Sequence, residues 1–347
     1  MLLLVATLMS LTLANAGTDT AVEPVQAPPF EEMLKIDAHA HFFDEMPEFV
    51  EMLRRTNMRV VNICVYGTMP ELLQLAEQRA EMLHQKYRGT LYFASTFDLT
   101  RRNEPDYTEQ VIAWLDKTFE AGAIMVKIWK EVGMDLKKPD DTYLMPDDPL
   151  FDPIYEHLVK RGKPLMAHLA DPIDAWLSLD PSSVHYAYFR DNPKWHLYGR
   201  ENVPSHAAIL AARDNIMVKH PDLVVVGAHL GSMAHDVDEV AKRFDRFPNF
   251  YVDVSARTPA LRQQPTEKVR EFFIKYQDRI LYGLDASKVT QAGAPSEEER
   301  VAFTRGIEKT YRAEYQYYAG TLALPRAVLE KFYHKNAQHV MPALAEP

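Results

Sequence analysis

The chain of 347 residues has one cysteine, no excess of basic residues and, beyond its N-terminus, no long apolar run. A single cysteine, Cys64, excludes an intrachain disulfide and a cysteine-based zinc finger. Cys64 lies in the apolar run 60–66, so we expect it to be a small buried hydrophobe. Because no other stretch approaches the roughly 18 apolar residues that span a bilayer, the folded part is predicted to be soluble.

The charge balance restricts the partners of the chain. It has 39 lysines and arginines against 49 aspartates and glutamates, a net charge of −10 without a basic stripe. Such a surface argues against binding to nucleic acid or to an anionic membrane. We therefore expect a small-molecule substrate, and the sequence leaves open whether the chain forms a homo-oligomer.

The N-terminus has the pattern of a signal peptide. Residues 1–16 carry no charge, have an apolar centre and end in Ala14-Asn15-Ala16, the small-x-small pattern of a cleavage site. Residues 17–30 are predicted to be a linker and residues 31–345 a single domain. Export to the periplasm or the medium is expected, although no lysine or arginine precedes the apolar run, which leaves a cytoplasmic location open.

Strands and helices alternate along the rest of the chain. Helical periodicity separates the strands at 70–87, 108–121, 149–161, 205–219 and 233–247, and a closing helix is predicted at 324–340. Eight-fold alternation of apolar strands and helices predicts a (β/α)8 TIM barrel of the α/β class. Eight apolar runs are typical of buried strands: 34–41, 59–66, 90–97, 123–129, 164–168, 223–229, 250–254 and 280–285.

Two connections are long enough to build a substrate pocket, namely 130–148 and 169–204. Long loops that follow the strands of a barrel form the active-site rim. The second one contains Asp171, Trp176 and Trp195, which could shape that pocket.

Histidines and an aspartate stand at the ends of several strands. His39 and His41 are two residues apart in the first strand and therefore face the same side. His168, His229 and Asp285 end the fifth, sixth and eighth strands. Imidazole nitrogens and a carboxylate oxygen that converge on one mouth form a set suited to Zn²⁺.

These motifs resemble the amidohydrolase superfamily, over roughly residues 34–340. The matching pieces include Asp37-Ala38-His39-Ala40-His41, Gly227-Ala228-His229-Leu230-Gly231 and Tyr282-Gly283-Leu284-Asp285. The sequence of the seventh strand, 248–255, is similar to the corresponding strand of the "amidohydrolase 2" branch. This branch contains aminocarboxymuconate-semialdehyde decarboxylase and related aromatic-acid decarboxylases, hydratases and lactonases.

The resemblance implies a metal site and a catalytic pair. His39, His41, His168 and Asp285 are the implied ligands of one divalent metal, Zn²⁺ or alternatively Mn²⁺. His229 and Asp285 are the implied catalytic residues. Other branches carry a carboxylated lysine that bridges two metals, and Lys127 stands at the corresponding position, so a binuclear centre stays open.

A mechanism follows from this set. A metal held by these residues would lower the pKa of a bound water from about 15.7 to about 7. Asp285 could then accept the proton of that water, and His229 could polarise the substrate oxygen or protonate the leaving group. Arg257, just beyond the seventh strand, is the candidate that binds an anionic substrate. Asp37 is expected to orient a ligand histidine.

Three functions are compatible with these residues. The first is a metal-dependent hydrolase that cleaves an ester, lactone or amide, and the expected export favours it. The second is a lyase of the same branch that decarboxylates or hydrates a small carboxylic acid. The third, a metal-binding scaffold without activity, is the weakest, because a scaffold does not need five polar residues at one mouth.

Overall fold

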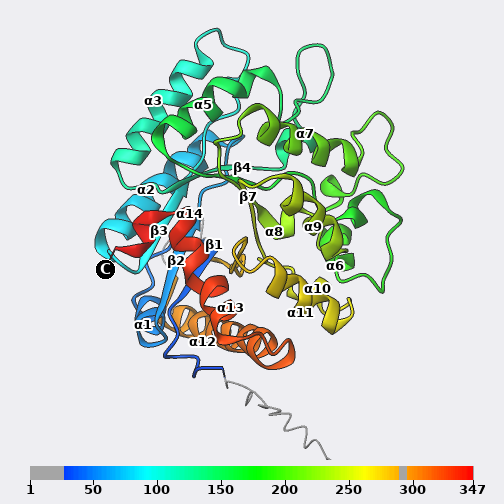
Figure 1. The fold of residues 1–347 in the computed structure, drawn as a ribbon. Coiled ribbons are helices and arrows are strands. Elements are labelled where there is room, and N and C mark those ends of the chain that lie inside the picture. The colour runs from blue at the N-terminus through cyan, green and yellow to red at the C-terminus, as the bar shows by residue number, and fades with distance from the viewer. Residues whose placement is uncertain (1–26, 289–294, 347) are drawn as a thin grey trace, which may run out of the picture.

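A computed structural model describes residues 27–288 and 295–346 of the chain (Figure 1). The predicted signal peptide and most of the predicted linker lie outside these two ranges. Near the start of the first range, Phe30 is buried, and the centroid of its ring lies 5.4 Å from that of Tyr315. No helix in the described ranges has both the length and the apolar character needed to cross a membrane.

The centre of the fold is a parallel sheet whose strands follow one another in chain order. Each strand is short and almost entirely buried, because helices cover its outer face. The prediction of strands alternating with helices is confirmed. The strands are β1 Lys35–Phe42, β2 Met58–Ile63, β3 Leu91–Ser95, β4 Met125–Ile128, β5 Leu165–Ala167, β6 Val225–Gly227, β7 Phe250–Asp253 and β8 Ile280–Leu281.

Backbone hydrogen bonds beyond β8 close this sheet into a barrel. The amide of Ala38 donates to the carbonyl of Tyr282 at 3.0 Å, and the amide of Asp285 donates to the carbonyl of His39 at 2.7 Å. The short strand β9, Ser287–Lys288, then continues along His41 and Phe42. The first and last strands of the barrel are thus neighbours, which brings Asp285 beside the two histidines of β1.

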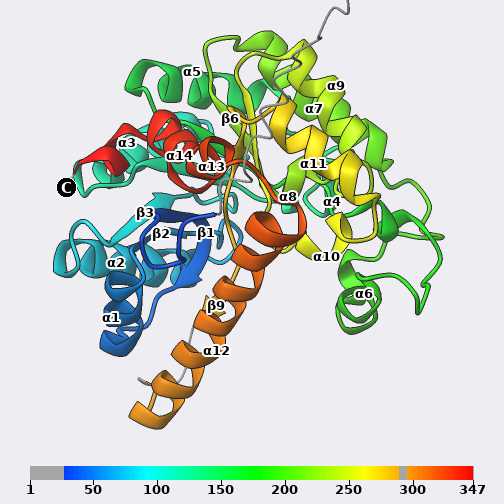
Figure 2. The same ribbon diagram turned by 60° about the horizontal axis from the view of Figure 1, so that its bottom comes forward.

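Helices surround the barrel (Figure 2). Several of them begin with a proline in the first turn, where its missing N–H leaves no hydrogen bond unmade. The helices between the strands are α1 Pro47–Arg55, α2 Pro70–Lys86, α3 Tyr107–Glu120, α5 Asp152–Arg161, α7 His206–Lys219, α9 Val237–Arg246 and α11 Thr266–Lys275. The two long connections contain the short helices α4 Glu131–Met134 and α6 Tyr186–Asp191.

The C-terminal part differs in detail from the sequence prediction. The predicted helix 324–340 consists of α13 Arg326–Glu330, a π-helical turn Lys331–Lys335 and α14 Asn336–Val340. A 20-residue helix, α12 Glu297–Gln316, precedes them and was not predicted. It lies beside α1, to which Arg300 and Glu48 join it by an ion pair, and it is the longest helix in view in Figure 2.

The two ends of the barrel have different contents. At the N-terminal end, Ile36, Val61 and Leu281 point inward and pack against Met341 and Leu344 of the chain terminus. This end is therefore an apolar plug. The polar residues of the barrel interior gather at the opposite end, where active sites of this fold are built.

Candidate metal centre

The two histidines of β1 lie on its inward face, as the spacing predicts. His39 is almost completely buried, and 14% of the His41 side chain is exposed. Their ring centroids are 5.4 Å apart. Asp285, which follows β8, has its Oδ1 atom 3.7 Å from Nε2 of His39 and 3.2 Å from Nε2 of His41. The three side chains thus form one cluster of ligand-type atoms.

Acceptors on the far side of each ring fix the orientation of these imidazoles. Nδ1 of His39 lies 3.0 Å from Oδ2 of Asp253, and Nδ1 of His41 lies 2.7 Å from the carbonyl oxygen of Ile63. A carbonyl oxygen can only accept, so Nδ1 of His41 donates and carries the proton. Each Nε2 atom consequently points toward Asp285, which is the arrangement of metal-binding histidines in proteins.

His229 joins this cluster from a left-handed turn. Residues 229–232 all have positive φ, with 59° at His229 and 57° at Leu230, conformations that cost energy for residues other than glycine. The Nδ1 atom of His229 donates to the carbonyl oxygen of Ser255 at 2.8 Å, and its Nε2 atom lies 3.9 Å from Oδ2 of Asp285. The turn thus directs the ring of His229 back over the mouth of the barrel.

The glycine that precedes this turn is required by the packing. A Cβ atom at Gly227 would lie 2.7 Å from the ring of Phe250 and 2.9 Å from Cα of Gly231. Neither the ring nor the backbone can move away without disturbing β7 or the turn. Gly227 therefore allows the close approach that positions His229.

The charge states of these groups fit a bound cation. Burial lowers the pKa of His39, with a further contribution from the charge of Lys127, and burial places the pKa of His229 well below its usual range. Burial alone would raise the pKa of Asp285, but the imidazoles of His41, His229 and His39 hold it well below the usual range. Neutral imidazole nitrogens and a charged carboxylate, turned toward one another, are a donor set that a divalent metal satisfies.

Asp253, which ends β7, connects the parts of the site. Its Oδ1 atom accepts from the backbone amides of His229 and Ser255, each at 3.0 Å, while Oδ2 faces the ring of His39. Burial alone would raise its pKa, but His39, His229 and the hydroxyl of Ser255 hold it below the usual range. We did not single out Asp253 from the sequence. Asp253 and Ser255 are two residues apart, as His39 and His41 are, and that spacing was the available signal.

Asp37 contacts His39, but not in the expected way. Its Oδ1 atom accepts from the backbone amide of His39 at 3.0 Å and from that of Leu284 at 3.1 Å, and Oδ2 accepts from the hydroxyl of Tyr311 at 2.7 Å. Burial raises the pKa of Asp37 to about 7. Asp37 thus joins the strands β1 and β8, and the partner of the His39 ring is Asp253.

His168, at the end of β5, lies at the same mouth. Its ring centroid is 4.4 Å from that of His229, and its Nε2 atom is buried without a hydrogen-bond partner among the described residues, 3.6 Å from Oδ1 of Asp171. Burial, together with the charges of Lys127 and Lys130, places its pKa well below the usual range. The groups of atoms close enough to share an ion, within the described ranges, are His39/His41/Asp285 and His39/His229/Asp253. The role of His168 as a ligand stays a prediction.

Lys127 projects from β4 into the same space. It is completely buried, and its Nζ atom lies 3.3 Å from Nε2 of His39. Burial lowers its pKa to about 8, so a fraction of the amine is neutral near physiological pH. A neutral amine is the form that reacts with carbon dioxide, and the position of Lys127 is compatible with the predicted bridging role.

Two further cations face the mouth. Arg257 is 8% exposed, donates from Nη1 to the carbonyl of Ala256 at 3.0 Å, and its buried Nε has no hydrogen-bond partner in the described part of the chain. Lys130 lies against the ring of Trp195 at 4.2 Å and forms an ion pair with Asp171 at 2.6 Å. Sequence analysis did not identify Lys130 as a functional residue. Of these two cations, Arg257 is the one with a buried donor that has no partner among the described residues.

A family model described as Amidohydrolase matches residues 36–342. No curated protein sequence matches the chain. Among solved structures, 2,6-dihydroxybenzoate decarboxylase from Rhizobium is 13% identical, with a TM-score of 0.52 over 89% of this chain and 99% of its own. 4-Oxalomesaconate hydratase from Rhodopseudomonas palustris is 13% identical, with a TM-score of 0.53 over 90% of this chain and 97% of its own.

A third solved structure, 5-carboxyvanillate decarboxylase from Novosphingobium aromaticivorans with bound manganese, is 13% identical, with a TM-score of 0.50 over 91% and 99%. At this identity the solved structures support the fold alone. The family match covers nearly the whole described chain and includes every strand end discussed above. This chain belongs to the amidohydrolase family.

Proposed function

We propose that this protein is a metal-dependent lyase that acts on a small carboxylic acid, by decarboxylation or by addition of water. The observation that carries the proposal is a buried arginine with an unused donor, Arg257, at the same mouth as the cluster of His39, His41 and Asp285. Structures of similar fold are a 2,6-dihydroxybenzoate decarboxylase, a 5-carboxyvanillate decarboxylase and a 4-oxalomesaconate hydratase. All three act on organic acids, as their names say.

The residues of the cluster fit one divalent metal. Three ligand atoms from His39, His41 and Asp285 lie within 4.8 Å of one another, and a ligand atom of His168 would complete a set of four. When bound there, the metal would supply Lewis acidity toward a substrate oxygen or a water. Zn²⁺ suits this mixture of nitrogen and oxygen ligands, and Mn²⁺ is the metal in one structure of similar fold.

Each of the other side chains has a task that its surroundings permit. Arg257 binds the substrate carboxylate, because a guanidinium pairs with a carboxylate through two parallel hydrogen bonds. His229 accepts or donates a proton at Nε2, since its Nδ1 proton is held by the carbonyl of Ser255. Lys130 stays in place through Asp171 and the hydroxyl of Tyr188, which accepts from it at 2.6 Å, and it adds positive charge to the mouth.

Hydrolysis of an ester or lactone is the second candidate. It is favoured by Asp285, whose Oδ2 atom lies only 3.9 Å from His229, so that the carboxylate can accept a proton from water while His229 acts on the leaving group. Export, which we also propose from the N-terminal sequence, agrees with this activity. The Lewis acidity of the metal serves both reactions, and the ligand set does not separate them.

Product analysis separates the candidates. Purified protein is incubated with hydroxybenzoates, unsaturated dicarboxylic acids and lactones, and the products are followed by carbon dioxide release, loss of the alkene and acid release. We expect carbon dioxide or a hydrated acid, and an Arg257→Gln variant that raises KM by about tenfold or more for these acids. Acid release from lactones alone would support the hydrolase, and no turnover of any probe by metal-loaded protein would contradict both.

A further inference from the structure

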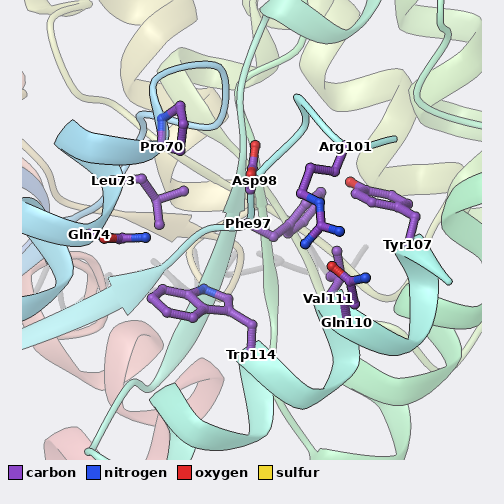
Figure 3. A pocket seen from close by; sticks show the side chains of 10 residues that line it. All are labelled: Pro70, Leu73, Gln74, Phe97, Asp98, Arg101, Tyr107, Gln110, Val111 and Trp114. Carbon is purple, nitrogen blue, oxygen red and sulfur yellow. The ribbon is translucent and has the colours of Figure 1, made fainter. Parts of the chain in front are cut away.

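A second cleft lies outside the barrel, between α2, α3 and the loop that follows β3 (Figure 3). It has a volume of about 210 Å³, room for roughly seven water molecules at ~30 Å³ each. This size fits a single amino acid or aromatic acid. None of its lining residues belongs to the candidate metal centre: Pro70, Leu73, Gln74, Phe97, Asp98, Arg101, Tyr107, Gln110, Val111 and Trp114.

The inner part of the cleft is apolar and firmly held. Leu73, Phe97 and Val111 form a buried floor, with at most 4% of each residue exposed. Trp114 forms a side wall, and its indole N–H donates to the carbonyl of Thr96 at 2.9 Å. An apolar group of a ligand would meet a preformed surface here, which keeps the entropic cost of binding low.

The rim of the cleft carries one charge of each sign. Asp98 accepts from the amide and the hydroxyl of Thr100 through Oδ1, at 2.7 and 2.6 Å, whereas its Oδ2 atom makes no hydrogen bond with any described residue. Arg101 pairs with Glu104 on the exposed side. Because an exposed ion pair of this kind contributes little, a ligand carboxylate can replace Glu104 at small cost.

Tyr107 supplies an independent sign of a ligand. It is 2% exposed, it lines the cleft, and its hydroxyl has no hydrogen-bond partner among the described residues. Buried hydroxyls are rarely left unpaired, because water or another polar group usually satisfies them. Figure 3 shows the hydroxyl end of Tyr107 directed toward Asp98 and Arg101, so a polar group of a ligand held between these charges could bond to it.

Two helix N-termini also face this cleft. α2 begins at Pro70 and α3 at Tyr107, and both residues line it. Neither helix has a side-chain cap at its N-terminus. The positive ends of two helices of 17 and 14 residues, next to Arg101, favour an anionic group at this end of the cleft.

We propose that this cleft binds a free amino acid with an apolar side chain, such as L-phenylalanine. The ammonium group pairs with Oδ2 of Asp98, and the carboxylate pairs with Arg101 near the helix N-termini. The side chain lies on the floor of Leu73, Phe97 and Val111. A zwitterion is the ligand that satisfies both rim charges at once, and the proposal is independent of the reaction at the barrel mouth.

Calorimetric titration with three probes tests the pairing. L-Phenylalanine has both charged groups, 3-phenylpropanoate lacks the ammonium, and 2-phenylethylamine lacks the carboxylate. We expect L-phenylalanine to bind with a Kd below 1 mM. Each of the other two probes should have a Kd that is higher by about tenfold or more. The titrations use Arg257→Gln protein as well as wild type, because the mouth could itself bind phenylpropanoate.

Three variants assign the binding to the cleft. The Asp98→Asn variant should bind L-phenylalanine no more tightly than phenylpropanoate. The Arg101→Gln variant should bind L-phenylalanine no more tightly than phenylethylamine. The Tyr107→Phe variant should bind L-phenylalanine severalfold more weakly than wild-type protein does. Thermal unfolding checks that each variant is folded. Absence of binding to wild-type protein at 10 mM, equal affinity for the three probes, or affinities unchanged in the folded variants would overturn the proposal. Binding lost only in Arg257→Gln protein would place the ligand at the mouth and overturn it as well.

Discussion

Two buried lysines of the barrel show how its two ends differ. Lys35 begins β1 at the apolar end, and its ammonium donates to the carbonyl oxygens of Phe30, Met33 and Thr56, the latter two at 2.7 Å. Lys127 lies in β4 at the mouth, and its nearest polar partner in the described structure is Nε2 of His39, at 3.3 Å. Both are at most 1% exposed, so burial alone does not distinguish them.

The difference lies in how far each lysine is satisfied. Every N–H of Lys35 has a backbone acceptor, which is the property of a residue that stabilises the fold. Lys127 shares its surroundings with His168 and Arg257, whose Nε2 and Nε atoms have no partner among the described residues. Unpartnered buried polar atoms at the C-terminal end of a barrel are the groups that a bound metal and substrate would satisfy, in agreement with the proposed function.

The largest effects are expected from the two histidines that face each other at the mouth. His229→Ala should keep the metal and lower kcat by about 10²–10⁴-fold, because it removes the proposed proton-transfer group. His168→Ala should lower metal content and activity together, since a site with one ligand fewer binds more weakly. Metal analysis and steady-state kinetics on the two variants check this pair. A His229→Ala protein without metal, or a fully active one, would show that the role of His229 is misassigned.

A smaller loss is expected when the support of the ligands is weakened. Asp253→Asn keeps the size of the side chain but provides only one acceptor oxygen, so the ring of His39 is no longer held in one orientation. Changes of this kind cost about 10–100-fold in metal affinity or activity. Metal affinity is measured by competition with a chelator, with Ser255→Ala as the milder control. An unchanged affinity in folded Asp253→Asn protein would contradict the role of Asp253.

The two lysines themselves should give opposite results. Lys35→Met leaves three carbonyl oxygens without a donor and should lower the free energy of unfolding by about 1–3 kcal/mol, with unchanged activity per folded molecule. Lys127→Met removes an unsatisfied buried cation, so it should leave stability unchanged or raised while activity falls. Denaturant unfolding and kinetics on both variants give the comparison. Loss of stability without loss of activity in Lys127→Met would make the two lysines alike.

An effect that appears only as a pH dependence of stability concerns a buried carboxylate outside the mouth, Glu77 of α2. Its Oε1 atom accepts from Ser95 and Thr96, Oε2 has no partner among the described residues, and burial raises its pKa to about 7. In the unfolded chain its pKa is about 4.3, so the folded state binds more protons between these values. The contribution of Glu77 to the free energy of unfolding is therefore complete below about pH 4. It decreases by up to about 3 kcal/mol as the pH rises to about 7.

Glu77→Gln should remove this slope, because glutamine does not titrate. Denaturant unfolding of both proteins between pH 4.5 and 7.5 measures it, with buffers of equal ionic strength. Asp253 should behave in the opposite way, since its neighbours keep it charged. Its contribution to the free energy of unfolding is therefore lost only at acidic pH. An identical pH dependence of the two proteins would contradict this prediction, because it would show that folding does not raise the pKa of Glu77.

The barrel and the strand ends were accessible from the sequence because both follow from simple periodicities. Apolar runs alternating with helical segments predicted the fold, and the two-residue spacing of His39 and His41 predicted their common face. The helix α12 was missed although Ser296 and Glu299, which form its capping box, have the spacing of that motif. The π-helical turn at 331–335 has no comparable signal, because tertiary packing decides it.

The supporting contacts of the site could not be predicted residue by residue. That Asp253 rather than Asp37 holds the ring of His39 depends on how β7 and β1 lie across the barrel, which no local pattern specifies. The left-handed turn at His229 is also a tertiary result, since three residues other than glycine, His229, Leu230 and Ser232, adopt positive φ there. Lys130 was overlooked because its partners, Asp171 and Tyr188, come from the distant segment 169–204.

The most direct test of the metal centre is the metal content of protein purified without added metal, measured by elemental analysis together with activity. The account predicts about one equivalent of Zn²⁺ or Mn²⁺ per chain in wild-type protein, and a large loss in a His39→Ala, His41→Ala double variant that stays folded. About two equivalents would instead support a bridging Lys127. Full activity in protein that contains no metal would contradict the central claim.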